Sequence, residues 1–426
     1  MSNLGPVIAF ASRLYRDQAS TIYAGYVRRD PMALLELRPG RADPYAIYDR
    51  LRAKGTLIPT RLGNLATTSH RVCRSVLRDR RFGVTPIDGA ATPDVSHENL
   101  TFLEMNPPDH TRLRRLVQPA FSPKAVATYR TRIDQTVGDL LDQAAAAGEF
   151  DLVSTFAAPL PIAVITDLLG VPDANAEDFA RYGATIGSAL DGIKSMRHAA
   201  QLQTSSNALN GLFEHLFELR RQDPQDDIVS RLVAAEGDQI QPGEMRPMCI
   251  LLLVAGFETT VNLIGNCVLA LLDHPEQWEA LCADPERLAP KAVEETLRFD
   301  PPVQRTVRSA LEPLELEGRA ITKDQEVVTL LGAANRDPEV YDRPDVFDIQ
   351  RDGTPDNLAF SSGIHYCIGQ PLALLEATTA VQMLAERLPG LSRAGEVVRR
   401  NATTIRGPIR LPVRAGARRA VVTAAS

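Results

Sequence analysis

The run Phe360-Ser-Ser-Gly-Ile-His-Tyr-Cys-Ile-Gly369 places one thiol, Cys367, in a glycine-containing loop directly before a predicted helix. That helix is expected to begin near Gln370-Pro371, because proline fits the first turn of a helix. The unpaired amide groups and the positive end of the helix dipole favour a thiolate over a thiol, and a thiolate binds iron. The loop therefore predicts a metal ion held by a single sulfur.

The other residues of this loop suit a flat, metal-containing cofactor. Gly363 and Gly369 allow the backbone to approach a macrocycle, Phe360 would shield the sulfur from water, and His365 could donate to a carboxylate at the cofactor edge. A lone cysteine is usually a small buried hydrophobic residue, but these residue types at these spacings argue against that alternative. The run resembles the haem-binding loop of the cytochrome P-450 family, whose pattern F-x-x-G-x-H-x-C-x-G it matches at every fixed position. The resemblance implies that Cys367 is the axial ligand of a haem b iron.

A second motif, Ala255-Gly-Phe-Glu-Thr-Thr260, lies midway along a helix predicted over residues 243–272. Gly256 is unfavourable there by about 1 kcal/mol relative to alanine, so it has another purpose. Either it widens a groove that admits water and protons, or it permits close packing of a neighbouring helix. The run is similar to the family's oxygen-activation motif, [AG]-G-x-[DE]-T-[TS]. This implies that Thr259 hydrogen-bonds iron-bound dioxygen and that Glu258 relays protons.

Glu295 and Arg298 are spaced to form an ion pair on one helical face. Taken alone, such a pair is usually exposed and contributes about 0.2–0.5 kcal/mol. It resembles the family's E-x-x-R helix, which implies a buried tether for the segment that leads to the haem loop. Val346 stands where the family usually has arginine or histidine as a third member. Either Arg343 substitutes for it, or the tether consists of Glu295 and Arg298 alone.

His110 and Arg114 share one face of a predicted helix. They could be a polar pair on the surface, whereas the resemblance implies that they donate hydrogen bonds to the haem propionates. Arg308 aligns with a further propionate arginine. Two carboxylates inside a protein need charged partners, so this set and His365 make chemical sense together. The implied cofactor-binding residues are His110, Arg114, Arg308, Phe360, Gly363, His365, Cys367 and Gly369.

Composition bounds the class of protein. The 426 residues are 44% hydrophobic and 23% charged, as in a soluble globular protein, and the net charge of −6 argues against nucleic-acid binding. The five cysteines form no CxxC pair, so neither a disulfide framework nor a zinc site is expected. The first residues suggest no signal peptide or anchor, and Glu258 within the apolar run 249–272 favours a buried helix over a membrane span. We expect a cytoplasmic protein.

Helical patterns dominate the chain, strand-like pieces are short, and no linker divides it. Helices are predicted over residues 44–54, 70–78, 109–118, 123–147, 159–169, 175–190, 196–222, 243–272, 275–283, 288–299 and 371–387, and strands over 56–60, 64–67, 303–309, 314–316, 326–331 and 410–414. Residues 83–101 read as a long loop. We expect a mainly α protein with small β-sheets: a single cytochrome P-450 domain over residues 43–413, after an extension over 1–42 and before a tail over 414–426. The haem would lie between the central long helix and the helix after the cysteine loop.

The resemblance implies a bacterial-type haem-thiolate monooxygenase that hydroxylates a hydrophobic small molecule. No flavin or nicotinamide motif is present, so the electrons would come from a separate ferredoxin and its NAD(P)H reductase, docking on the Cys367 side. Leu374 lies on that side, at a position where arginine is common. Candidate pocket residues are Leu251, Ala255, Val303 and Thr404, and the protein is expected to be a monomer.

Two other functions stay open from the sequence. A peroxide-driven haem-thiolate peroxygenase would need no donor protein, but the Glu258-Thr259 pair counts against it. A non-catalytic haem carrier or sensor would explain Cys367 and leave the predicted proton route unexplained.

Overall fold

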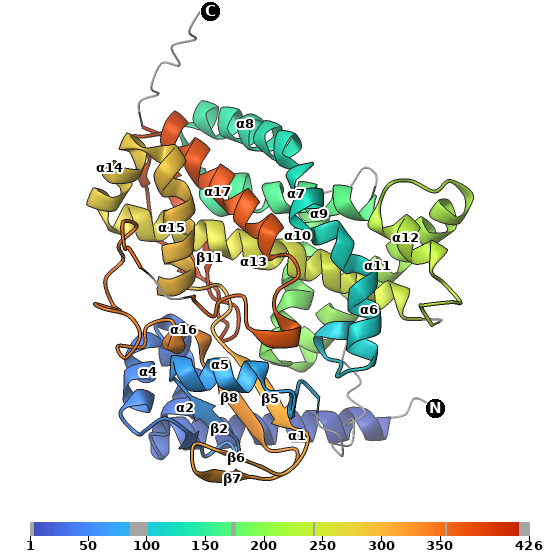
Figure 1. Cartoon of the computed structure of the whole chain (residues 1–426), viewed down its shortest axis with the longest axis vertical. Helices are drawn as coiled ribbons and strands as arrows, with labels where there is room; N and C mark the ends of the chain where they lie inside the picture. Colours follow the sequence, from blue (N-terminus) through green and yellow to red (C-terminus); the bar gives the residue numbers. More distant parts are fainter. Residues whose placement is uncertain (1–3, 86–100, 172–175, 242, 354–355, 417–426) are drawn as a thin grey trace, which may run out of the picture.

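The structure, a computed structural model, describes residues 4–85, 101–171, 176–241, 243–353 and 356–416. Helices form the larger, upper part of the molecule in Figure 1, and the main sheet lies in the lower part beside the N-terminal helices. The predicted class, mainly α with small sheets, is confirmed.

The longer helices are α1 (Leu4–Ile22), α4 (Tyr45–Arg52), α5 (His70–Arg78), α6 (Asp109–Val117), α8 (Arg130–Ala147), α9 (Pro159–Leu169), α10 (Ala176–Gly187), α11 (Met196–Gln222), α12 (Ile228–Ala234), α13 (Met245–Asp273), α14 (Pro275–Ala283), α15 (Pro285–Phe299) and α17 (Gln370–Arg387). The shorter ones are α2 (Pro31–Leu35), α3 (Arg38–Ala42), α7 (Pro123–Ala127) and α16 (Leu331–Ala334). The strands are β1 (Ile58–Pro59), β2 (Leu65–Thr67), β3 (Phe82–Gly83), β4 (Glu149–Asp151), β5 (Thr306–Ala310), β6 (Leu314–Leu316), β7 (Arg319–Ile321), β8 (Glu326–Thr329), β9 (Ser392–Arg393), β10 (Val398–Arg399), β11 (Pro408–Arg410) and β12 (Pro412–Arg414).

Helix α13 is the centre of the fold. It is long and apolar enough to cross a membrane, but 83% of its most apolar window is buried inside the protein. Helices α9, α10, α15 and α17 all pack against it. A mostly apolar helix surrounded by other helices is a core helix, as the sequence predicted.

Local sequence explains where several helices begin. Helices α9, α14 and α15 each begin with a proline in the first turn. Side-chain oxygens cap two others: Ser195 Oγ accepts from His198 N at 3.0 Å in α11, and Asp227 Oδ1 accepts from Ser230 N at 2.7 Å in α12. The single helix predicted over 123–147 was wrong. The chain breaks after α7, where Thr128 Oγ1 donates to Ala125 O at 2.6 Å, and resumes as α8.

The main sheet has the strand order β1-β2-β8-β5-β3. Strands β2 and β8 run parallel, whereas the other neighbours are antiparallel. A separate hairpin pairs β10 with β11, and we call residues 398–410 the C-terminal hairpin. This hairpin packs beside the central helix, because β11 contacts α13.

Candidate functional site

The Cys367 loop leads directly into α17. Cys367 N donates to Phe360 O at 3.0 Å, which closes the loop, and Gln370 begins the helix as predicted. The sulfur is half-buried, and the five cysteines are all free. No cluster of three or more His, Cys, Asp or Glu side chains suited to a metal occurs within the described part of the chain, so a metal here would rely on a single protein ligand.

The two glycines of the loop have different roles. Gly363 has φ +73°, and a Cβ there would lie 2.3 Å from Leu77 O at the end of α5. Its close approach in this structure is therefore to the α5 backbone. The approach of this loop to a planar cofactor stays a prediction. Gly369 has open space where a Cβ would lie, which agrees with an approach to a large flat group.

Electrostatics around the sulfur differ from the sequence prediction. Burial raises the pKa of the Cys367 thiol, and this exceeds the opposing effects of the Gly369 amide, the charge of Arg114 and the Gln370 amide. The helix start alone does not produce a thiolate. A metal bound by Cys367 would supply the remaining stabilisation, since a coordinated thiol loses its proton.

Four basic side chains from three separate segments gather beside the loop. The rings of His110, on α6, and His365 lie 4.2 Å apart between centroids. Both ring nitrogens of His110 and Nε2 of His365 are buried without a hydrogen-bond partner among the described residues. Arg114 Nη2 donates to Tyr366 O at 2.5 Å, and Arg308 on β5 donates to Thr306 Oγ1 at 2.9 Å and Val307 O at 2.8 Å.

The pKa shifts indicate that the surroundings of this cluster are electropositive. Burial, together with Arg308, His110 and Arg114, lowers the pKa of His365 to about 3. Burial lowers the pKa of Arg308 to about 10 and also lowers that of Arg114. Unpaired buried donors and mutually repelling cations are unfavourable unless a negative group joins them. The two propionates of a haem would satisfy this requirement, so the residues present fit the group.

The middle of α13 is open on one side. Leu251 to Val254 are buried, but Ala255 is exposed and Thr259, one turn later, is partly exposed. Thr259 Oγ1 donates to Ala255 O at 3.0 Å, so the hydroxyl lies on this accessible face. A flat cofactor or its ligand can therefore reach Thr259.

Gly256 lies on a different face of α13 and permits close helix packing. A Cβ there would approach Cδ1 and Cγ1 of Ile165, on α9, to 2.9 Å. Because that side is filled by an apolar side chain, close packing accounts for the glycine, and a water-holding groove is not needed to explain it.

Glu258 is 4% exposed and faces away from solvent. Its carboxylate pairs with Arg400 of the C-terminal hairpin, and Asn262 Nδ2 donates to Glu258 Oε1 at 3.4 Å and to Glu258 O at 2.7 Å. Arg400 could not be predicted as a partner of Glu258, because a contact between a central helix and a hairpin near the C-terminus has no local pattern.

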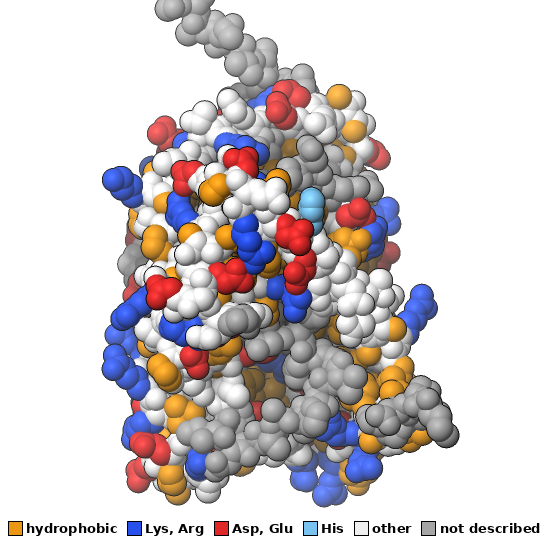
Figure 2. Space-filling view, turned by 90° about the vertical axis from the view of Figure 1, so that its right-hand side faces the viewer, with side chains coloured by type: hydrophobic (Ala, Val, Ile, Leu, Met, Phe, Trp, Pro, Cys, Tyr) orange, Lys and Arg blue, Asp and Glu red, His pale blue; other side chains and the backbone are white. Residues whose placement is uncertain are grey.

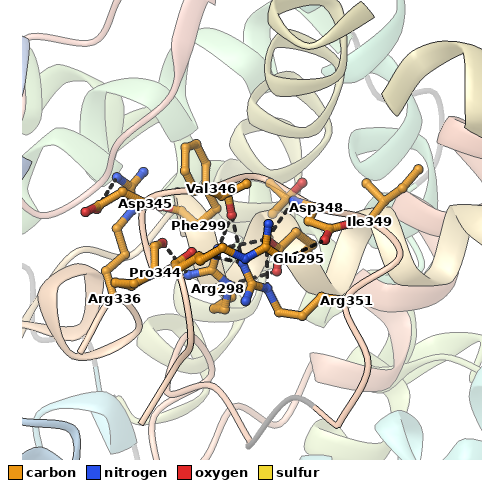
Figure 3. A network of polar contacts seen from close by, with 12 residues as sticks. Glu295, Arg298, Phe299, Arg336, Pro344, Asp345, Val346, Asp348, Ile349 and Arg351 are labelled. Atoms are coloured by element: carbon orange, nitrogen blue, oxygen red, sulfur yellow. Dashed lines mark hydrogen bonds and ion pairs between the residues drawn. The ribbon is translucent and has the colours of Figure 1, made fainter. Parts of the chain in front are cut away.

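Glu295 and Arg298 form a buried two-bond pair (Figure 3). Arg298 Nε donates to Glu295 Oε2 at 2.8 Å, and Nη2 donates to Oε1 at 2.7 Å. Arg298 also donates to three main-chain carbonyls of residues 335–351, a segment that we call the meander: Asn335 O at 3.2 Å, Pro344 O at 2.8 Å and Val346 O at 3.0 Å. The pair therefore tethers the meander in this structure, and the exposed alternative is excluded.

The third member of this network is Arg351, so both alternatives, Arg343 and a pair without a third member, were wrong. Arg351 Nε lies 3.5 Å from Glu295 Oε1, and Arg351 donates to the carbonyls of Asp342, Arg343 and Val346. The side chain of Arg343 is 60% exposed, and its ion pairs are with Asp342 and Asp348, at 3.4 and 3.6 Å. Figure 3 shows Arg351 reaching the pair from the end of the meander.

The four pocket candidates fall into two groups. Val303 bridges Ile405, and Gln304 N donates to Thr404 O at 2.9 Å, so Val303 and Thr404 lie side by side. Leu251 is buried in the main core, one turn before the exposed Ala255. The long loop predicted over residues 83–101 lies mostly outside the described residues.

Comparison with known proteins agrees with this site. The sequence model of the Cytochrome P450 family matches residues 66–388. The "Biotin biosynthesis cytochrome P450" of Bacillus subtilis is 39% identical over 362 residues, which cover 83% of this chain and 91% of that protein. The "Cytochrome P450 monooxygenase PikC" of Streptomyces venezuelae is 40% identical over 389 residues, covering 88% and 91%.

A solved structure has a similar fold over most of its length. P450BioI, crystallised in complex with hexadec-9Z-enoic acid ligated acyl carrier protein, superposes with a TM-score of 0.82 at 37% identity, covering 88% of this chain and 100% of that one. Cytochromes P450 carry haem and act as monooxygenases. The chain described here belongs to the cytochrome P450 family.

Proposed function

We propose that this P450 monooxygenase hydroxylates a hydrophobic small molecule, with Cys367 as the axial ligand and with electrons from a separate ferredoxin and its NAD(P)H reductase. The observation that carries the assignment of the site is a pair of histidines beside the half-buried Cys367: both ring nitrogens of His110 and Nε2 of His365 are buried without a hydrogen-bond partner among the described residues. His110, His365, Arg114 and Arg308 would bind the propionates. When bound, haem supplies the activation of dioxygen at its iron.

The protein side of the reaction requires a hydroxyl and a proton source near the cofactor. Thr259 presents its hydroxyl on the open face of α13, where it would hold a hydrogen bond to oxygen or water. Glu258, on the adjacent position, would pass protons inward from the side of the C-terminal hairpin. This pair favours oxygen-dependent over peroxide-driven turnover.

The role of Thr259 can be tested against a neighbouring threonine. Thr259→Ala should lower the product formed per NAD(P)H oxidised, while peroxide-supported turnover is retained. Thr260→Ala is the control, because Thr260 is 1% exposed and its Oγ1 donates to Gly256 O within the helix. Unchanged product per NAD(P)H in Thr259→Ala would refute the role of this hydroxyl, and turnover with peroxide alone would favour the peroxygenase.

A cleft of about 760 Å³ beside the Cys367 loop supports the proposed docking face for the donor. Its lining includes the exposed Arg74 and Arg78 of α5 together with Tyr366 and Gln370. Leu374 is partly buried and packs against the main core. An acidic ferredoxin would complement the two arginines.

Charge reversal would test this surface. Arg74→Glu with Arg78→Glu should slow reduction by ferredoxin and weaken its dependence on salt, since two attractive charges are replaced. Arg80→Glu is the matched control, because Arg80 is exposed but does not line the cleft. Equal effects of Arg80→Glu and the double variant would place the donor elsewhere.

The substrate is proposed to be apolar, because Leu251, Ala255 and Val303 present apolar side chains. Relatives support this: one structure holds a hexadecenoyl acyl carrier protein, and CYP267B1, at 35% identity, holds myristic acid. Titration with myristic acid, followed by the shift of the haem absorption from low to high spin, tests the fatty-acid class directly. A shift with polar sugars instead would contradict the proposal.

We also propose that the protein works as a cytoplasmic monomer without nucleic-acid partners. On the face shown in Figure 2, basic and acidic side chains are interspersed over the upper part, which is not the single-sign surface that nucleic acid binds. Sedimentation of the purified protein would reveal any dimer.

A further inference from the structure

Helix α1 is attached to the rest of the protein along one face. Its partly buried residues recur every three or four positions, which places them together on that face: Phe10, Ala11, Leu14, Gln18 and Thr21. Gln18 Nε2 donates to Lys194 O at 2.9 Å, and α1 packs against α2 and against the π-helical turn Tyr23–Val27 that follows it. The other described side chains of α1 are exposed, and in Figure 1 its N-terminal half extends beyond the main sheet.

Large apolar and aromatic side chains line the exposed side of this segment. Ile8, Tyr15 and Ile22 are seven residues apart, which places them in one row along the helix. Tyr23 and Tyr26 follow in the π-helical turn. We call these five residues the α1 stripe, and each is between 50% and 61% exposed. Single apolar side chains are common on a protein surface, but a row of them along one segment indicates a surface that binds an apolar partner.

Four arginines accompany the α1 stripe: Arg13, Arg16, Arg28 and Arg29. All four are exposed, and none of their side chains has a hydrogen-bond or ion-pair partner within the described part of the chain. Residues 4–29 contain one acidic residue, Asp17, although the whole chain has a net charge of −6. Arg16 follows Tyr15 directly, so it lies about 100° round the helix, on the side away from the attached face. The segment therefore joins an apolar row to unpaired positive charge.

These two features together fit a lipid surface. An interfacial helix buries aliphatic and aromatic side chains at the boundary of the acyl chains, where a tyrosine keeps its hydroxyl in water, and its arginines reach anionic headgroups. A second copy of this chain fits less well, because pairing two stripes would bring the arginines of both copies together. Arg13, Arg16 and Asp17 lie in the middle of the 19-residue helix, which argues against a span across the bilayer.

We propose that α1 and the turn after it bind the surface of a bilayer that contains anionic phospholipids. The α1 stripe enters the boundary between headgroups and acyl chains, and the four arginines contact phosphate groups. The attachment is peripheral and reversible, so the protein divides between the cytoplasm and the cytoplasmic face of a membrane. This surface goes beyond the proposed reaction, and it places the enzyme where apolar molecules are concentrated.

Vesicle binding of the intact, haem-loaded protein tests this surface without substrate or electron donor. Wild type is sedimented with sucrose-loaded vesicles of phosphatidylcholine containing roughly 30% phosphatidylglycerol, and with vesicles of phosphatidylcholine alone. Binding to the anionic vesicles should be at least about tenfold stronger and should weaken as salt is raised. Equal binding to the two kinds of vesicle, or binding to neither, would overturn the proposal.

Two apolar residues of the stripe can be replaced without disturbing the core, because both are exposed. Ile8→Ser with Ile22→Ser should weaken binding to the anionic vesicles by about tenfold. Val398→Ser with Ile409→Ser is the matched control, since these side chains are exposed on the C-terminal hairpin, and it should bind as wild type does. Equal binding by the two double variants would remove α1 from the contact.

The charged contribution is tested separately. Arg16→Glu with Arg28→Glu should abolish the preference for anionic vesicles, because two attractive charges become repulsive. Arg319→Glu with Arg410→Glu changes the net charge equally at two exposed arginines elsewhere and should retain the preference. The same loss in both double variants would show an effect of net charge alone and contradict the assignment to α1.

A fluorescent probe reports insertion directly. Trp278 is the only tryptophan in the sequence and is buried in the main core, so its emission should not change on vesicle binding. Tyr15→Trp should add an emission that shifts to shorter wavelength with the anionic vesicles, and an unshifted emission would refute the insertion of the stripe. A dimer seen by sedimentation velocity without vesicles, and dissociated by Ile8→Ser with Ile22→Ser, would assign the stripe to a second copy and overturn the lipid proposal.

Discussion

Replacement of Arg351 by alanine should destabilise the protein by about 2–3 kcal/mol, although this residue belongs to no recognised motif in the sequence. Its side chain is 10% exposed and makes three hydrogen bonds to carbonyls of the meander, at 2.5, 3.1 and 2.9 Å, besides its contact with Glu295. A hydrogen bond to a charged group contributes about 1.5–3 kcal/mol. In the alanine variant, water can hydrogen-bond to the three freed carbonyl groups and recover part of this energy. The net loss of stability is therefore smaller than the sum of the three hydrogen-bond energies.

Alanine variants of two other arginines should give losses of stability on either side of the value for Arg351→Ala. Arg343→Ala should change the free energy of unfolding by less than about 0.5 kcal/mol, since its ion pairs are exposed and long. Arg298→Ala should cost about 3–5 kcal/mol, because it leaves the Glu295 carboxylate buried without its closest cation.

Urea unfolding followed by far-ultraviolet circular dichroism would give the three free energies, and the ferrous carbon-monoxide spectrum would report how much haem each variant retains. The order of losses should be Arg298, then Arg351, then Arg343. If Arg343→Ala cost as much as Arg351→Ala, the assignment of the third member would be wrong.

Three more variants test separate parts of the site. Gly363→Ala should destabilise the protein by more than about 2 kcal/mol in urea unfolding, because a Cβ there meets the α5 backbone. Gly318→Ala is the control: its φ of +71° is similar but the space around it is open, so it should cost only about 1 kcal/mol of backbone strain. Equal losses for the two variants would contradict the steric argument. Burial raises the pKa of Asp300, but Arg406 and the other cationic neighbours outweigh this effect and hold the pKa below its usual value. The ionised Asp300 therefore stabilises the folded protein above about pH 4, and this stabilisation is lost as the pH falls through the folded-state pKa. Asp300→Asn should therefore flatten the decline of stability below about pH 4, and a decline as steep as that of wild type would refute this. Cys367→Ser should lose the ferrous carbon-monoxide absorption typical of thiolate-bound haem, and its retention would disprove the axial assignment.

Much of this site could be predicted from sequence because its signals are local. Proline and capping residues mark helix ends directly, and the bounds predicted for α9, α11 and α14 agree with the structure. The cysteine loop and the acid–alcohol motif on α13 are likewise contiguous runs.

What the sequence could not predict depends on contacts between distant segments. Whether Arg343 or Arg351 reaches Glu295 depends on the path of the meander, which has little regular structure to reveal it. The reason for Gly256 lies in Ile165 of another helix, and the partner of Glu258 lies on the C-terminal hairpin. Helix α1 was also missed in the extension before residue 43.

The way in which Arg298 and Arg351 hold the meander bears on how freely this segment can evolve. Both guanidinium groups bind Val346 through its peptide oxygen, an atom that every amino acid possesses. The valine side chain is 41% exposed and takes no part in the attachment. A lineage could therefore lose a charged residue at this position and keep the anchorage of its haem loop, provided that position 351 retained an arginine.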